Sequence, residues 1–291
     1  MNKITRVERV LDGRSTDGPA RGELFIWSEF VGKFSGGDGT DPNELHRLLD
    51  RLGADIVVAE AEGGTVDYWR KESDLFVLAL ISGPLWAIIE NLGWEEFCRL
   101  AIRNPDSARA QAKLAMNRHI EQASRCLEAG AHGILILDDL AGDDGPLISP
   151  GAMRQTIIPV LSESVDELRR LGRPVVFHSD GNTTTLFKDL FRIGFSAYHF
   201  QPVKRMDMAG MRAAAEEGLA LWGGLDLTDV SGWKSPEEIA AETAALIRDN
   251  ASNRYIFGST TGLYPEVPLE PVLAAYDAAA AVVGERHGRE Q

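Results

Sequence analysis

The stretch Pro174-Val175-Val176-Phe177-His178-Ser179-Asp180-Gly181-Asn182 decides the fold class of this chain. Its first four residues form a short apolar run of the kind that is buried in a parallel sheet. A segment with helical character follows over Thr185–Ile193. A strand, a polar loop and a helix in this order make one unit of an alternating β/α protein. In such proteins the chemistry usually takes place where the strand ends, which here is at His178 and Asp180.

The same unit recurs along the chain. Eight apolar runs are found, at Glu23–Trp27, Asp55–Ala59, Leu75–Ile81, Gly133–Leu137, Pro174–Phe177, Ala197–Phe200, Leu219–Trp222 and Arg254–Phe257. Helical periodicity separates most of them, as over Asn43–Leu52, Pro105–Ala129, Pro150–Leu171, Met208–Glu217 and Pro236–Asn250. Eight strands that alternate with helices are typical of a (β/α)8 TIM barrel. We therefore predict an α/β protein with this fold.

The predicted barrel occupies residues 1–291 as a single domain, because no composition shift, proline-rich linker or low-complexity tract divides the chain. The alanine-rich segment Ala274–Val283 is expected to be a C-terminal helix that packs against the barrel. A doubly wound open sheet is the alternative. It is disfavoured because no Gly-x-Gly-x-x-Gly turn follows the first apolar run.

Charge and composition limit the kinds of molecule that the protein is expected to bind. The formal net charge is -14, from 30 Lys+Arg and 44 Asp+Glu, and a field of this sign repels nucleic acids and anionic membranes. No stretch approaches the roughly 18 apolar residues of a membrane span, and the N-terminus lacks the apolar core of a secretory signal. Cys98 and Cys126 lack metal-ligand spacing and are expected to be buried, reduced thiols. We expect a cytoplasmic protein with a small-molecule substrate.

Polar side chains follow nearly every predicted strand. In chain order they are Ser28, Glu29, Glu60, Glu62, Trp86, Glu90, Asp138, Asp139, His178, Asp180, His199, Gln201, Asp226 and Thr261. The carboxyl ends of the strands meet at one end of a barrel, so these side chains are expected to surround a common cup. Crowded carboxylates raise one another's pKa, which suits general acid or base catalysis. Alternatively they bind a cation, and a histidine with two or three carboxylates suits zinc, manganese or iron.

Each of these residues also has a structural alternative. The pair Asp138-Asp139 could cap a neighbouring segment or accept hydrogen bonds from loop amides. His178 could be a satisfied core histidine, and Asp180 could serve the turn with Gly181. His199 lies inside an apolar run and is expected in the core.

Four groups of residues carry a resemblance to a known family. They are Asp138-Asp139-Leu140 with Gly145–Pro150, then Pro174–Asn182, then Gln201-Pro202 and Met206–Met208 with Gly223–Asp226, and finally Tyr255–Ser259 with Gly262–Pro265. Together they make residues 75–280 similar to the uroporphyrinogen decarboxylase superfamily of (β/α)8 proteins. The resemblance is closer to its methyltransferase-like branch than to the heme-pathway decarboxylase.

Two departures from the family pattern define the expected chemistry. The zinc methyltransferases have a His-x-Cys pair after strand five and a further cysteine after strand eight. His178 matches the histidine, whereas Asp180 and Thr261 stand at the cysteine positions, so the site is richer in oxygen and harder. Heme-pathway decarboxylases have an arginine-containing loop that nothing near Phe25–Val31 resembles, and a histidine where this chain has Thr261.

The resemblance implies a methyltransferase that uses a corrinoid as co-substrate and is assisted by a metal ion, with Zn²⁺ expected. A corrinoid protein and a second copy of the chain, as a homodimer, are the implied partners. We expect catalytic roles for His178, Asp180, Asp138, Asp139 and Glu90, metal binding by His178 and Asp180, and substrate binding by Glu60, Trp86, Gln201, Asp226 and Thr261. Two alternatives stay open. One is a decarboxylase of a porphyrinogen or a smaller carboxylic acid, and the other is a non-catalytic binder of a tetrapyrrole or metabolite.

Overall fold

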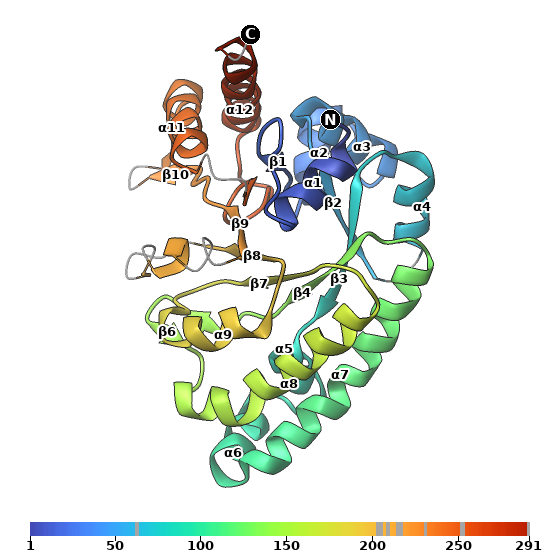
Figure 1. Ribbon diagram of the computed structural model, residues 1–291, viewed down its shortest axis with the longest axis vertical. Helices are drawn as coiled ribbons and strands as arrows, with labels where there is room; N and C mark the ends of the chain where they lie inside the picture. Colours follow the sequence, from blue (N-terminus) through green and yellow to red (C-terminus); the bar gives the residue numbers. More distant parts are fainter. Residues whose placement is uncertain are drawn as a thin grey trace. The chain divides into compact units, whose positions relative to one another are not determined.

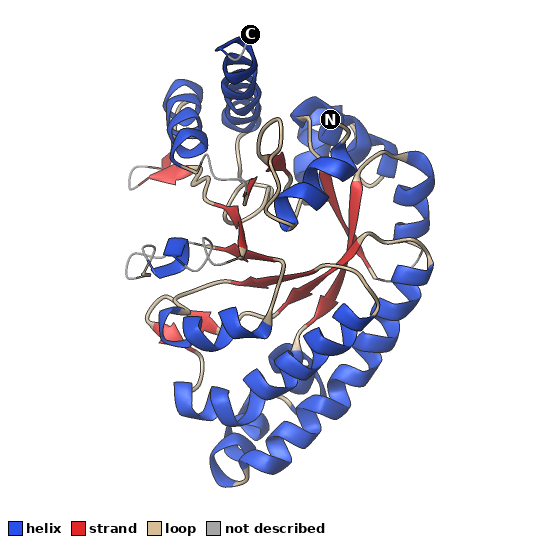
Figure 2. Ribbon diagram, in the orientation of Figure 1, coloured by secondary structure: helices blue, strands red, loops and turns tan. Residues whose placement is uncertain are grey.

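The computed structural model describes residues 1–61, 64–201, 206–207, 210–213, 218–229, 232–250 and 254–289. Within them parallel strands alternate with helices, which confirms the predicted (β/α)8 barrel fold (Figure 2). The eight barrel strands are β1 (Ala20–Arg21), β2 (Ile56–Glu60), β3 (Phe76–Ser82), β4 (Gly133–Leu137), β7 (Val175–Ser179), β8 (Ala197–Phe200), β9 (Ala220–Gly223) and β12 (Tyr255–Phe257). By its internal contacts the chain divides into a first unit (Met1–Val58, Ser73–Phe76 and Trp222–Gln291) and a second unit (Ala59–Glu72 and Val77–Leu221).

The helices begin and end close to the predicted positions where the capping signals are strong. They are α1 (Lys3–Leu11), α2 (Ser28–Ser35), α3 (Pro42–Leu52), α4 (Thr65–Glu72), α5 (Pro84–Leu92), α6 (Trp94–Arg103), α7 (Pro105–Glu128), α8 (Pro150–Arg170), α9 (Phe187–Ile193), α11 (Pro236–Asp249) and α12 (Leu269–Arg289). In α11, for example, Ser235 and Glu238 form a reciprocal capping box on either side of the first-turn proline. The helix predicted over Met208–Glu217 lies largely outside the described residues, and the predicted C-terminal helix lies inside the longer α12.

In the second unit the strands follow one another in the order β3, β4, β7 and β8. The parallel register places Leu137 of β4 beside His178 of β7, and His178 beside His199 of β8. The long helices α7 and α8 pack against each other and are seen side by side in Figure 1. Because the strands are in parallel register, the loops after β4 and β7 leave the sheet at the same level.

The first strand lies earlier in the chain than predicted. The ladder with β12 is formed by Ala20 and Arg21, and Asp55 N donates to Arg21 O at 2.7 Å, which joins β1 to the chain entering β2. The predicted strand Glu23–Trp27 continues beyond this ladder and makes only an isolated bridge, between Ile26 and Leu263. Its apolar side chains were the visible signal in the sequence, but the regular pairing is made by the residues that precede them.

A buried carboxyl group, that of Glu23, joins three parts of the first unit. One oxygen, Oε1, accepts a hydrogen bond from Tyr276 of α12 at 2.6 Å. Both oxygens accept from Ser259 N, at 3.1 and 3.2 Å, and Ser259 Oγ also donates to Oε2. Burial raises the pKa of Glu23 to about 7, although the hydrogen bonds from Ser259 and Tyr276 oppose the shift.

We expect Glu23→Gln to weaken the pH dependence of stability. The folded-state pKa of about 7 lies above the ordinary value of 4.5, so Glu23 stabilises the fold fully below pH 4.5. This contribution, roughly 3 kcal/mol by linkage, is lost as the pH rises through about 7. Urea unfolding between pH 4.5 and 8 should therefore show a smaller decline for Glu23→Gln than for the wild type. Glu128→Gln, at an exposed position of α7, is the control. Parallel declines for the wild type and Glu23→Gln would contradict the prediction.

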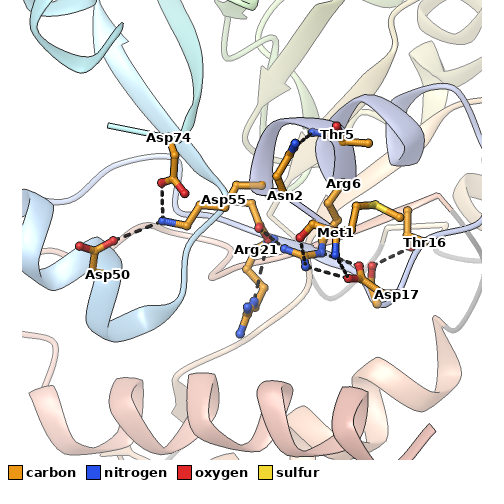
Figure 3. A network of polar contacts seen from close by, with 12 residues as sticks. Met1, Asn2, Thr5, Arg6, Thr16, Asp17, Arg21, Asp50, Asp55 and Asp74 are labelled. Carbon is orange, nitrogen blue, oxygen red and sulfur yellow. Dashed lines mark hydrogen bonds and ion pairs between the residues drawn. The ribbon is translucent and has the colours of Figure 1, made fainter. Parts of the chain in front are cut away.

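Arg6 attaches helix α1 to the rest of the first unit. Its guanidinium donates to Asp17, with Nε 2.8 Å from Oδ1 and Nη2 3.1 Å from Oδ2, and Nη1 pairs with Asp55 (Figure 3). The side chain of Asp55 is 1% exposed, and its second oxygen accepts from Arg21 N at 2.9 Å. Asp55 precedes β2 and Arg21 ends β1. The ion pair therefore connects α1 to the start of one strand and to the end of another.

Two smaller observations concern the predicted cellular setting. No helix in the described part of the chain is long and apolar enough to cross a membrane.

Cys98 is half-buried on α6 and Cys126 is buried on α7, and both are free thiols. Burial raises the pKa of each thiol, which keeps both in the less reactive protonated form.

Candidate metal centre

Asp138 lies at the end of β4 and caps helix α5. Its Oδ2 accepts from Leu85 N at 3.1 Å and its Oδ1 accepts from Trp86 N at 3.0 Å, so both oxygens contact the first turn of the helix. A carboxylate at this position satisfies free amides and interacts favourably with the helix dipole. Burial raises the pKa of Asp138 to about 7, with a smaller contribution from the charge of Asp139, and the two amide hydrogen bonds oppose the shift.

Gly83 is required by this cap for steric reasons. A Cβ atom at position 83 would lie 2.3 Å from Cβ of Asp138 and 2.5 Å from its carboxyl carbon. Contacts this short do not occur between real side chains. The start of α5 therefore approaches β4 closely only because residue 83 has no side chain.

Three other side chains meet at the ends of β4 and β7: that of His178, from β7 itself, and those of Asp139 and Asp180, from the loops that follow. Nε2 of His178 lies 3.4 Å from Oδ1 of Asp139 and 3.5 Å from Oδ1 of Asp180. One ligand atom from each residue lies within 4.8 Å of the other two. Asp180 N also donates to Asp139 Oδ1 at 2.8 Å, which fixes the loop after β7 against the loop after β4. One imidazole nitrogen and two carboxylates in this arrangement form a donor set for a divalent cation.

Burial determines the protonation states of His178 and Asp180. His178 is buried, and burial lowers its pKa to about 4 although the charge of Asp139 acts in the opposite direction, so the ring is neutral at pH 7. Burial, and then the charge of Asp139, raises the pKa of Asp180 to about 6, so this carboxyl is mostly ionised at pH 7. A neutral imidazole with ionised carboxylates is the state in which these groups bind metals.

One oxygen of Asp180 is buried without a partner. The side chain as a whole is 43% exposed, but Oδ1 is inaccessible to solvent and has no hydrogen-bond donor among the described residues. Buried carboxylate oxygens are nearly always hydrogen-bonded, and an exception requires an explanation. A cation held between Asp180, Asp139 and His178 provides one.

The loop that carries Asp180 depends on Gly181. Gly181 has a φ of 78°, a conformation that residues with a side chain rarely adopt. A Cβ atom there would also lie 2.3 Å from Ala141 O, in the hairpin formed by β5 (Ala141–Gly142) and β6 (Gly145–Pro146). Ser179 adds a further link, because its Oγ accepts from Leu140 N at 2.9 Å. The turn geometry and the position of Asp180 are therefore set together.

A second histidine lies behind the first. His199 of β8 is fully buried, as the sequence predicts, and its Nδ1 lies 2.9 Å from Nδ1 of His178. Its closeness to His178 depends on the register between β7 and β8, which no motif in the sequence indicates. His199 therefore contacts a residue of the candidate site, whereas the sequence counted it among the strand-end side chains but favoured a position in the core.

Two predicted site residues line other hollows of the second unit. Glu60, at the end of β2, lines a cavity of about 220 Å³ with Thr65 and Arg125, among others. Glu90, exposed near the end of α5, lines a cavity of about 570 Å³ with Arg118 and further residues of α7. Neither glutamate is a member of the Asp139, His178 and Asp180 group.

The remaining predicted substrate-binding residues are placed as follows. In the second unit, half-buried Trp86 lies in the first turn of α5, with Nε1 buried and without a hydrogen-bond partner among the described residues, and Gln201 follows β8. Asp226 and Thr261 belong to the first unit. Asp226 Oδ1 accepts from Thr228 N at 3.0 Å and from Thr228 Oγ1 at 2.9 Å, which organises its own turn. Glu62 lies outside the described residues.

Comparison with known proteins agrees with this fold and with the motifs. The uroporphyrinogen decarboxylase (URO-D) family profile matches residues 57–282. The chain therefore belongs to the uroporphyrinogen decarboxylase family, a family of (β/α)8 enzymes, as the motifs of the sequence predict.

The fold also agrees with that of a solved structure. It is similar to a methyltransferase from Methanosarcina mazei, with a TM-score of 0.77 and 17% sequence identity over 99% of each chain. D-psicose 3-epimerase from Clostridium cellulolyticum H10 gives a TM-score of 0.48 and 13% identity over 84% of this chain and 93% of that one. No curated protein sequence matches the chain.

Proposed function

We propose that this protein is a metal-dependent methyltransferase and that Asp139, His178 and Asp180 bind its metal ion. The observation that carries the proposal is their convergence, with ligand atoms within 4.8 Å of one another and one buried oxygen of Asp180 that has no hydrogen-bond donor among the described residues. Membership of the family and the shared fold with the Methanosarcina mazei methyltransferase support the choice of methyl transfer.

The donor set favours a hard or borderline cation. One imidazole and two carboxylates suit Zn²⁺, Mn²⁺ or Fe²⁺, and three protein ligands leave positions for a substrate atom. The two cysteines lie on α6 and α7 and are not part of the group. We expect Zn²⁺ to be bound, with an oxygen rather than a sulfur atom of the substrate as its natural partner.

The proposed reaction removes a methyl group from an oxygen atom. When bound, the cation would act as a Lewis acid on that oxygen and make it a better leaving group. The two carboxylates would hold the cation and orient the substrate, and neutral His178 would complete the set. A reduced corrinoid would supply the nucleophile that takes the methyl group, and the oxygen would keep the electron pair of the broken methyl–oxygen bond and then take a proton. A corrinoid protein is accordingly the proposed partner.

Metal analysis and a methyl-transfer assay test the proposal together. Purified protein should contain a single divalent ion per chain, lose it to a chelator and regain it on addition of Zn²⁺. Loaded protein, mixed with methanol or an aryl methyl ether and cob(I)alamin, should give the absorbance change of methylcobalamin formation. Protein from which a chelator has removed the metal should not give this absorbance change. The absence of both bound metal and a corrinoid spectral change would exclude this function.

A decarboxylase is a second candidate, favoured by one specific observation. The pKa is raised to about 7 for Asp138 and to about 6 for Asp180, so Asp138 is partly protonated at pH 7 and Asp180 becomes so in mildly acidic solution. A protonated carboxyl can deliver its proton to the carbon that loses CO₂. Release of CO₂ from a porphyrinogen or a smaller acid by the metal-free protein would support this alternative over methyl transfer.

A further inference from the structure

The two buried histidines of neighbouring strands share one hydrogen bond. His178 and His199 are direct partners in the parallel register of β7 and β8, and their Nδ1 atoms are 2.9 Å apart. The ring centroids lie 4.9 Å apart with an interplanar angle of 61°. The side chains are 3% and 0% exposed, so water does not compete for this contact.

A hydrogen bond between two Nδ1 atoms contains a single proton, because one nitrogen must donate and the other must accept. If His199 donates, neutral His178 carries its own proton on Nε2, which then points toward Asp139 and Asp180 and has no lone pair for a cation. If His178 donates from Nδ1, its Nε2 lone pair faces the two carboxylates. Only the second arrangement lets His178 bind a metal ion together with Asp139 and Asp180.

We infer that His199 is the positioning residue of the metal centre, accepting the Nδ1–H of His178 and so holding that ring in its metal-binding tautomer. The inference rests on the proposed metal centre. Metal-ligating histidines commonly donate their second N–H to a carboxylate, a backbone carbonyl or water, and this contact fixes the tautomer and the ring orientation. In this protein the acceptor of that N–H is the buried imidazole of His199, on the adjacent strand.

The pair His199→Asn and His199→Leu tests the hydrogen bond apart from the packing. Both side chains branch at Cγ and have the same number of heavy atoms, but Asn can place its Oδ1 where Nδ1 was and accept the proton. We expect His199→Asn to bind Zn²⁺ within a few-fold of the wild type, and His199→Leu to lose about 10- to 100-fold in affinity. Calorimetric titration with Zn²⁺ measures both, and thermal unfolding of each variant reports whether the fold is retained.

The outcomes separate this inference from the proposed function. Wild-type protein that binds no Zn²⁺ would overturn the metal centre and the role of His199 with it. Binding by the wild type with equal affinities for His199→Asn and His199→Leu would overturn the role of His199 alone. Independently of the variants, ¹⁵N spectra of the Zn²⁺-loaded wild type should show His178 protonated at Nδ1. A proton at Nε2 of His178 would overturn the inference.

Discussion

Asp180→Asn is expected to remove metal binding and methyl transfer while leaving the protein as stable as the wild type, or more stable. An amide oxygen carries no charge and is a poor replacement for a carboxylate ligand. We expect at least a ~100-fold loss of Zn²⁺ affinity, more than is typical for changes behind the ligands. Stability should move the other way because burial of the Asp180 carboxylate is unfavourable: within the described part of the chain one of its oxygens is buried without a hydrogen-bond donor, and its pKa is raised to about 6.

Asp143→Asn is the matched control for this prediction. It makes the same chemical change at an exposed position between β5 and β6, and should alter neither metal affinity nor the unfolding midpoint. Zn²⁺ titration and thermal unfolding of the three proteins give the answer. Wild-type metal affinity in Asp180→Asn would exclude Asp180 as a ligand. A large loss of stability would instead show that Asp180 serves the turn, the structural alternative that the sequence left open.

Arg6→Met is expected to lower the free energy of unfolding by roughly 3–5 kcal/mol. The substitution leaves the carboxylate of Asp55 in a nearly fully buried position with its main ion-pair partner removed, which is the costly way to break a buried pair. Burial already raises the pKa of Asp55 despite the charges of Arg6 and Arg21. In the variant Asp55 keeps the hydrogen bond from Arg21 N at 2.9 Å and a more distant guanidinium, with Arg21 Nε at 3.9 Å.

Arg14→Met provides the comparison for Arg6→Met. Arg14 pairs with Asp12 at 2.7 Å, but both side chains are more than half exposed, at 55% and 59%. A surface pair of this kind contributes about 1 kcal/mol or less. Urea unfolding at pH 7 should therefore separate the two variants clearly, and similar losses for both would contradict the assigned role of Asp55 burial. The double variant Arg6→Met/Asp55→Leu should recover part of the loss, because the uncompensated charge is gone.

The fold could be predicted from the sequence because its signals are local. Proline at the starts of α3, α7, α8 and α11, with acidic residues in the first turn of all but α8, marks those helices to within one residue, and the apolar runs mark most strands. The first strand was predicted too late in the chain, at Glu23–Trp27. The residues that pair with β12 are Ala20 and Arg21, and they do not form an apolar run. That the whole chain acts as one domain stays a prediction.

The candidate site was harder to predict from the sequence, because it depends on strand register and on the direction of the side chains. The sequence placed Asp138 and Asp139 at the same strand end but could not show that one faces helix α5 and the other faces His178. It also could not align β7 with β8, and so it favoured a core position for His199 and did not predict its contact with His178. Roles for Glu60, Glu90, Gln201 and Thr261 in binding or catalysis stay predictions that substitutions must test.

The adjacent aspartates after β4 have a consequence for how such a site can evolve. Asp138 is committed to the helix it caps, together with Gly83, so a change there disturbs the architecture. Positions 139 and 180 contact each other and His178 and leave that cap untouched. Substitution at these two positions would therefore change the set of metal ligands while the cap of α5 keeps both of its hydrogen bonds.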